Sequence, residues 1–224
     1  YLSYWKNGPV AEALDFLIHT KKAVVGGTSA GMAVLGEACF SAQNGTVTSE
    51  EALSDPYGEK VTVEYGDFIH VPYLDNLITD THYDGRNRYG RHVAFLARLT
   101  TDHQQRFRGI ASEEYTAVCI DTTGLARVFG GFPESEDYAY FIQPNCNQPI
   151  FPEHCMPGKP LNWVRHEHAL TVCKVAGKQD GSDTFQLTDW KTAPGSTWER
   201  WWVEQGVLKK AVLHKLPECV LDKH

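Results

Sequence analysis

The motif GTSAG at residues 27–31 constrains this chain more than any other segment. Residues 22–25 (KAVV) predict a short strand before the motif, and residues 32–35 (MAVL) predict a helix after it. Between a strand and a helix, G-x-S-x-G is typical of a nucleophile elbow, in which glycines allow a cramped turn that exposes the serine. Ser29 is therefore the candidate nucleophile, and the Ala30 N–H is the candidate oxyanion donor. The structural alternative is that Ser29 merely caps the helix.

A serine nucleophile requires a base within hydrogen-bonding distance. His82 ends an extended segment and precedes a helix that we expect from about residue 84 to about residue 99. A histidine at a strand end would lie at the same sheet edge as the elbow, whereas His70 and His92 are interpreted as structural. The sequence does not decide which carboxylate would orient His82. The acidic candidates are Glu50, Glu51, Asp55 and Asp80.

Three arginines, Arg86, Arg88 and Arg91, follow His82 at the start of the expected helix. Guanidinium groups bind carboxylates through two parallel hydrogen bonds, so this cluster predicts a pocket for an acidic side chain or a free carboxylate. The alternative is a solvated helix face whose arginines pair with Asp84 and Asp102.

The segments GGTSAGMAV, TDTHYDGRNRYGR and RGIASEEYTAV resemble the cyanophycinase branch of the family that also contains aspartyl dipeptidases. Members are serine peptidases that cleave next to aspartate, and cyanophycinases hydrolyse a β-aspartyl-arginine polymer. The resemblance implies that Ser29 is the nucleophile and His82 the base. It puts the acidic third member at Glu50 or Glu51, of which we predict Glu51. It also implies a substrate pocket lined by Asp80, Thr81, Arg86, Arg88 and Arg91, with no metal or organic cofactor.

The same resemblance implies an α/β fold with a class I glutamine-amidotransferase-like (flavodoxin-like) parallel sheet, of which the N-terminal part is missing from this chain. We predict that residues 1–143 form the C-terminal portion of the hydrolytic domain. Five prolines mark residues 144–160 as a linker loop, and residues 161–224 are predicted to form a small β-rich C-terminal region. Strands are expected at 115–121, 126–129, 138–142, 169–175, 184–187, 198–204 and 207–213.

The charge balance and the cysteines limit which partners the protein can bind and in which cellular compartment it is expected. The excess of 28 acidic over 21 basic residues argues against a nucleic-acid partner, and no apolar run is long enough to suggest a membrane span. Cys146 and Cys155 flank a proline-rich loop and predict a loop-closing disulfide. Asn44 begins an N-x-T glycosylation pattern. Together these features predict a secreted or luminal protein.

The sequence thus predicts a serine hydrolase that cleaves an aspartyl or β-aspartyl peptide bond, with an acidic peptide as substrate. A catalytically silent secreted binding or structural protein on the same fold is the alternative. An amidotransferase-like enzyme is less favoured, because that chemistry uses cysteine. An elbow strand belongs inside a parallel sheet, yet only a helix precedes residue 22. We therefore expect a companion N-terminal chain from the same precursor, and a homodimer stays open.

Overall fold

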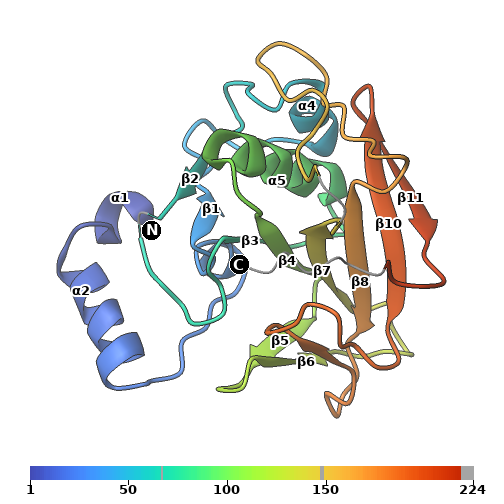
Figure 1. Cartoon of the computed structure of the whole chain (residues 1–224). Helices are drawn as coiled ribbons and strands as arrows, with labels where there is room; N and C mark the ends of the chain where they lie inside the picture. The colour runs from blue at the N-terminus through green and yellow to red at the C-terminus, as the bar shows by residue number, and fades with distance from the viewer. Residues whose placement is uncertain (67, 147–148, 218–224) are drawn as a thin grey trace.

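The computed structural model describes residues 1–66, 68–146 and 149–217, which form two packed β-sheets and several helices (Figure 1). The helical segments are α1 (Leu2–Trp5), α2 (Pro9–Asp15) with a π-helical turn (Phe16–Thr20), α3 (Ala30–Ala33), α4 (Ser49–Ser54) and α5 (Tyr89–His103). In spatial order the large sheet contains β11 (Val207–Val212), β10 (Thr197–Glu204), β8 (Leu170–Ala176), β7 (Tyr138–Pro144), β4 (Arg108–Ser112), β3 (Leu77–Asp80), β1 (Ala38–Phe40) and β2 (Val63–Tyr65). The small sheet contains β5 (Ala117–Ile120), β6 (Leu125–Phe129) and β9 (Thr184–Gln186).

The large sheet is mixed. Strand β3 pairs in parallel with β1 on one side and with β4 on the other, while the remaining neighbours pair antiparallel. The α/β class is therefore confirmed, but the expected parallel sheet is limited to three adjacent strands. The glutamine-amidotransferase-like arrangement stays a prediction.

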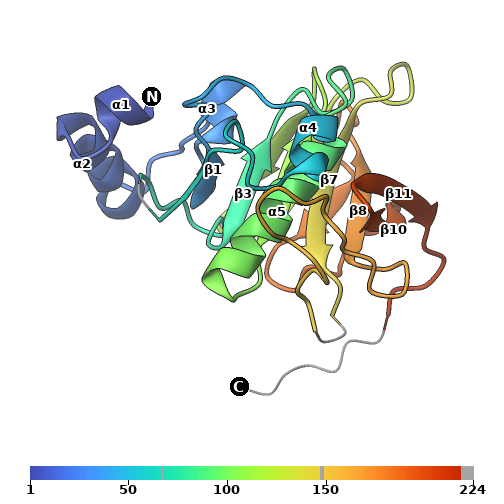
Figure 2. The ribbon, with the colours of Figure 1, turned by 90° about the horizontal axis from the view of Figure 1, so that it is seen from above.

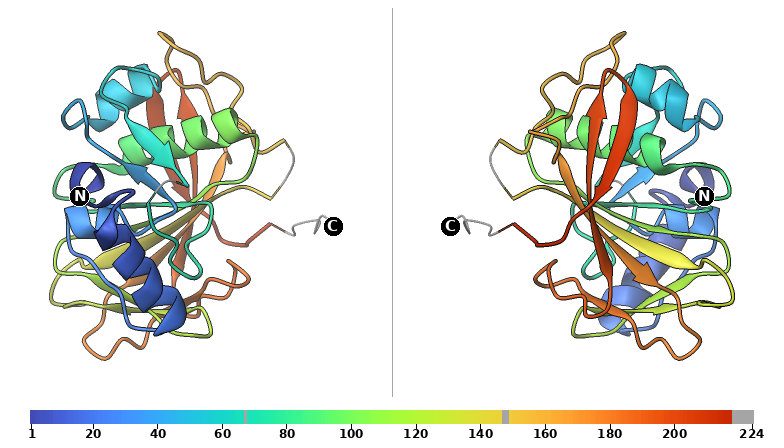
Figure 3. Two further views of the ribbon diagram at one scale, coloured as in Figure 1. Left: turned by 90° about the vertical axis from the view of Figure 1, so that its left-hand side faces the viewer. Right: turned by 90° about the vertical axis from the view of Figure 1, so that its right-hand side faces the viewer.

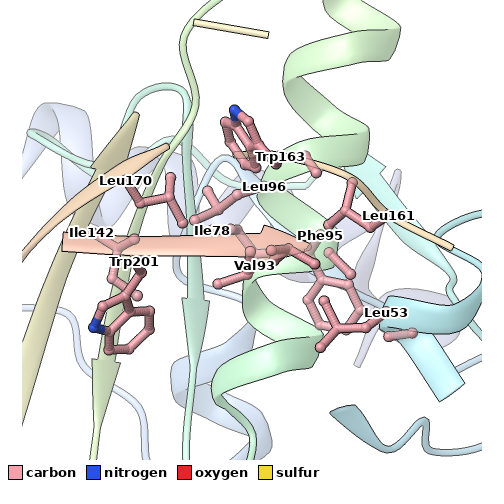
Figure 4. Close-up of a cluster of buried hydrophobic side chains, with 14 of the residues drawn as sticks. Leu53, Ile78, Val93, Phe95, Leu96, Ile142, Leu161, Trp163, Leu170 and Trp201 are labelled. Atoms are coloured by element: carbon pink, nitrogen blue, oxygen red, sulfur yellow. The ribbon is translucent and has the colours of Figure 1, made fainter. Parts of the chain in front are cut away.

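Alternating side chains build a hydrophobic core on each face of the large sheet. Ile78 and Ile142 point to the face covered by α5, where they meet Val93 and Leu96 (Figure 4). Ala111 belongs to the same core. The neighbouring residues along the same strands point to the opposite face, which the small sheet covers. That second core includes Leu77, Ile110, Phe141, Cys173, Phe185 and Trp190.

The C-terminal strands are continuous with this architecture. Strands β8, β10 and β11 extend the large sheet, and β9 completes the small one, so residues 161–217 share both cores with residues 1–143. All seven expected strands form, and every bound lies within two residues of the one expected. Cys155 is a buried free thiol, so the predicted Cys146–Cys155 disulfide is wrong. The sixth cysteine, Cys219, lies outside the described residues.

The predicted strand at residues 22–25 does not form. Val24 is fully exposed, and residues 22–28 join no strand of either sheet. This extended segment links α3 to α1 and α2, which lie beside the β1–β2 end of the sheet (Figures 2 and 3). No described strand runs alongside it to supply hydrogen-bond partners, which accounts for the difference. Within the described residues, no helix has the length and apolar character needed to cross a bilayer.

His92 illustrates how α5 is locked to the sheet. Its Nε2–H donates to the Ile78 carbonyl at 3.2 Å, so Nδ1 is left to accept from the Tyr83 hydroxyl, also at 3.2 Å. The ring is completely buried, and this desolvation lowers the pKa of His92 from 6.5 to about 4. The histidine interpreted from the sequence as structural is therefore a neutral core residue.

The buried His92 makes stability depend on pH. Between about pH 6.5 and 4 the unfolded chain binds a proton that the folded chain rejects, so the free energy of unfolding should fall as the pH falls, by up to about 3 kcal/mol. The loss should be absent above pH 6.5. Urea denaturation across this range measures it. The variant His92→Gln should flatten the slope and His103→Gln, at an exposed position of the same helix, should not; a slope unchanged in His92→Gln would contradict this account.

Candidate active site

The parallel strands β3 and β4 bring two distant segments together. Asp80 pairs with Ala111 at the carboxyl ends of these strands, and the chain continues from them to His82 and to Glu114. The Tyr83 N–H donates to the Ser112 carbonyl at 3.3 Å and holds the two continuing segments side by side. Because carboxyl ends of neighbouring parallel strands share one edge, His82 and Glu114 become neighbours although 32 positions separate them.

Ser29 reaches the same edge through a strained turn. Its φ of 51° and ψ of −120° are unusual for a residue with a Cβ. A methyl group on Gly27 would lie 2.2 Å from the Gly31 carbonyl, so only glycine fits there. The Thr79 hydroxyl donates to the Met32 carbonyl at 2.7 Å and ties α3 to β3. Ala30 opens α3, so its N–H has no acceptor within the helix and is free to meet an oxyanion.

Ser29, His82 and Glu114 form a hydrogen-bonded chain. Ser29 Oγ lies 3.0 Å from His82 Nε2, and His82 Nδ1 lies 2.6 Å from Glu114 Oε1. An ionised carboxylate only accepts hydrogen bonds, so Nδ1 carries the proton of a neutral His82 and Nε2 accepts from Ser29. This is the order of contacts that a serine nucleophile, a general base and an orienting acid require.

Glu51 does not take part in this chain, which corrects the sequence-based choice of the acid. Its carboxylate accepts from the Thr48 N–H and hydroxyl, in a capping box at the start of α4, and from Lys60 at 2.8 Å. The Lys60 ammonium and the Thr48 donors lower the pKa of Glu51 to about 2. Glu51 thus stabilises a helix terminus. Glu50 is exposed on the same helix, and neither it nor Asp55 contacts His82 in the described structure.

A pocket of about 690 Å³ opens beside Ser29. Phe40 and Val34 supply apolar walls, and Ser41, Gln43 and Thr46 supply polar ones. The charged lining residues are Lys6, Glu64, Asp80, Arg88 and Arg91. Thr81 and Ala30 also line it, whereas Arg86 is exposed outside it.

The two arginines that line the pocket, Arg88 and Arg91, differ in how many of their N–H groups are hydrogen-bonded. Arg91 holds both oxygens of the buried Asp80, through Nε at 2.8 Å and Nη2 at 2.5 Å, and its guanidinium stacks on Phe40. Arg88 donates through Nη1 to the carbonyl and hydroxyl of Thr81, and the same Nη1 lies 3.6 Å from Asp80 Oδ1. Burial, with the nearby Arg91 charge, lowers the pKa of Arg88 to about 10. The Arg91 guanidinium is thus occupied by Asp80, whereas Arg88 keeps N–H donors for an anionic ligand.

Arg91 should therefore matter first for stability. In Arg91→Lys one hydrogen bond of the buried pair and the stacking on Phe40 are lost, and we expect the free energy of unfolding to fall by about 2 kcal/mol. The matched change Arg86→Lys, at an exposed position, should leave it unchanged within about 0.5 kcal/mol. Chemical denaturation of both variants is the measurement. Equal stabilities would contradict a structural role for Arg91.

Two further positions complete the comparison with the sequence. Asn44 lies in an exposed turn, and its side-chain amide donates to the Glu59 carbonyl at 2.8 Å. Glycosylation there stays a prediction. Glu114 was missed because residues 108–112 were not expected to form a strand. An available signal was the short run Gly109–Ala111, which is followed, after Ser112, by two acidic residues.

Comparison with known proteins gives a distant relationship. No protein-family model matches the chain. The cyanophycinases of Synechococcus elongatus and Thermosynechococcus vestitus are each 28% identical to it over 148 residues, which is 63% of this chain. The matched part is 41% of each relative, so the chain spans about two fifths of the length of these curated relatives. The similarity supports a cyanophycinase-like relationship at a distance.

Proposed function

We propose that this chain carries the reaction centre of a serine-type peptidase that hydrolyses aspartyl or β-aspartyl peptide bonds. The hydrogen-bonded chain from Ser29 through His82 to Glu114 is the observation that supports this most directly. The strained turn at Ser29 and the pocket beside it agree with the same proposal. The distant cyanophycinase relatives favour a peptide substrate that contains aspartate.

In the proposed reaction Ser29 Oγ attacks the peptide carbonyl while His82 Nε2 takes the hydroxyl proton. The Ala30 N–H donates to the oxyanion that develops on the carbonyl oxygen. When the tetrahedral intermediate collapses, the carbon–nitrogen bond breaks and His82 returns the proton to the leaving amine. Water then hydrolyses the acyl-enzyme by the same sequence. Glu114 accepts the Nδ1–H throughout, holds the imidazole in this tautomer and stabilises its charged form.

Substrate selection is assigned to Arg88. It lines the pocket with Ser29, and its bonds to Thr81 use Nη1, so Nε and Nη2 have no hydrogen-bond acceptor among the described residues. Asp80 is shared between Arg88 and Arg91, so a ligand carboxylate that accepts from Arg88 would add a second anion to two guanidinium groups. Arg91 and Asp80 position Arg88 and Thr81, and Arg86 is not assigned a substrate contact.

A fluorophosphonate probe tests the nucleophile. The probe should label the chain at Ser29, as shown by peptide mass mapping. The unlabelled protein should hydrolyse β-aspartyl dipeptides, and the labelled protein should not. Labelling at another serine would overturn the assignment. If the folded protein is not labelled at all, the result would support the alternative, a catalytically silent binding protein on the same fold. The hydrogen bond between Ser29 and His82 makes that alternative less favoured.

A further inference from the structure

The residues next to His82 and Glu114 in the chain are both buried. Tyr83, which follows His82, has no exposed surface, and Glu113, which precedes Glu114, is only 6% exposed. Glu114 itself lies in an exposed turn after β4. The placement of the exposed carboxylate against His82 therefore depends on what holds these two buried neighbours.

Glu113 is bound to β7 by three hydrogen bonds. Its backbone N–H donates to the Tyr138 carbonyl at 3.1 Å, and its Oε2 accepts from the Tyr138 N–H at 2.9 Å. The other carboxylate oxygen, Oε1, accepts from the Tyr140 hydroxyl at 2.7 Å. Donors of one strand thus occupy both oxygens of a buried carboxylate, which fixes the backbone from which Glu114 continues.

Tyr140 also packs against the segment that carries His82. The centroids of the Tyr140 and Tyr83 rings lie 5.0 Å apart, and the Tyr140 hydroxyl lies 3.4 Å from the hydroxyl of Tyr89, the first residue of α5. Burial raises the pKa of Tyr140 well above its ordinary value of 10, so the hydroxyl keeps the proton that it donates to Glu113. One buried tyrosine therefore contacts both of the buried neighbours.

We propose that Tyr140 and Glu113 are positioning residues that hold Glu114 within hydrogen-bonding distance of His82. This inference rests on the proposed function, because it assigns the groups that align its acid with its base. Neither residue is among the described residues that line the pocket beside Ser29, so they act on the rate through the Nδ1–Oε1 hydrogen bond of 2.6 Å. A displacement of about 1 Å would take these two atoms beyond hydrogen-bonding distance.

The variant Tyr140→Phe tests the proposal, because it removes the hydroxyl and keeps the ring. We expect kcat for β-aspartyl dipeptides to fall about tenfold at an unchanged KM, since the released Glu113 carboxylate no longer fixes the turn. The matched control is Tyr57→Phe. It removes a hydroxyl that donates to the Asp102 carboxylate near the opposite end of α5, and it should leave kcat unchanged.

A double variant separates positioning from general damage to the fold. In a chain that already carries Glu114→Gln, adding Tyr140→Phe should cause no further loss of kcat, because the carboxylate that it positions is gone. If Tyr140→Phe does not fold, as judged by circular dichroism, Glu113→Gln replaces it. That variant keeps an acceptor for one of the two donors, and it should show the same effects to a smaller extent.

Nitrogen NMR of the His82 ring gives a readout that needs no turnover. At a pH at which the ring is neutral, the unaltered chain and Tyr57→Phe should show the proton on Nδ1, whereas Tyr140→Phe should show a mixture of both tautomers. An unchanged tautomer in Tyr140→Phe, or losses of kcat that multiply in the double variant, would overturn the inference. If the proposed function fails, no dipeptide is hydrolysed, and the tautomers alone decide whether Tyr140 aligns Glu114 with His82.

Discussion

Replacing Ser29 with alanine is expected to lower the rate of aspartyl-peptide hydrolysis by roughly a thousandfold or more. The substitution removes the oxygen that lies 3.0 Å from His82 Nε2, which is the hydroxyl that this base can activate. Stability should hardly change, because Ser29 is exposed and alanine keeps the same Cβ in the same strained backbone. Steady-state release of the amine product, together with thermal denaturation, measures both effects.

A second substitution at the same position separates chemistry from folding. Ser29→Gly should be equally inactive, but it should raise the free energy of unfolding by about 1 kcal/mol, because glycine adopts a φ of 51° without the Cβ clash. Turnover above a few per cent in either variant would remove Ser29 from the proposed role. Loss of stability in Ser29→Gly would contradict the account of strain at the elbow.

Much of the fold was predictable because its central strands are short apolar runs. Strands β7 and β8 send alternate side chains into two apolar cores, so both faces are apolar and the run is visible in the sequence. Strand β4 was not visible, because it is short and begins with Arg108. The structure explains this arginine: it is half-buried, and its guanidinium lies over the Trp190 ring, 4.8 Å from the centroid. A charged residue in a strand can thus hide it from a hydropathy pattern.

Of the three residues in the hydrogen-bonded chain, the sequence predicted Ser29 and His82 but not the acid. Ser29 and His82 stand in local motifs, and the structure brings them together. Glu51 was preferred from its place in the chain, but its distance from His82 depends on sheet order, which local sequence does not specify. Once β4 is known to lie in parallel beside β3, Glu114 follows from the shared edge.

The segment at residues 22–28 shows the limit of reasoning from one element to its surroundings. Its apolar residues predict a strand inside a sheet, yet Val24 is fully exposed and no described strand accompanies the segment. A β-strand needs a neighbouring strand to bond its backbone groups, so the propensity of one segment alone does not form it. The companion chain expected from the sequence stays a prediction, and a strand added along residues 22–25 is the specific contact that it would make.

Replacing Glu114 with glutamine should lower the rate of hydrolysis by about a hundredfold or more, whereas Glu51→Gln should keep it within about twofold. In Glu114→Gln the side-chain amide no longer compels Nδ1 to carry the proton and no longer stabilises the imidazolium, so Nε2 is a poorer base toward Ser29. In Glu51→Gln the site is untouched, and only the capping box of α4 and the pair with Lys60 are weakened.

The two variants also differ in where the damage appears. Glu114 has a side chain 45% exposed at the sheet edge, so its replacement should leave the melting temperature nearly unchanged while the rate falls. Glu51→Gln should lower the melting temperature slightly at an unchanged rate, because a capped helix terminus loses one acceptor. Measuring kcat, KM and thermal denaturation for both variants gives a crossed pattern that general destabilisation cannot produce. The reverse pattern, with Glu51→Gln inactive and Glu114→Gln active, would return the orienting role to Glu51 and require a different arrangement of the site from the hydrogen-bonded chain described above.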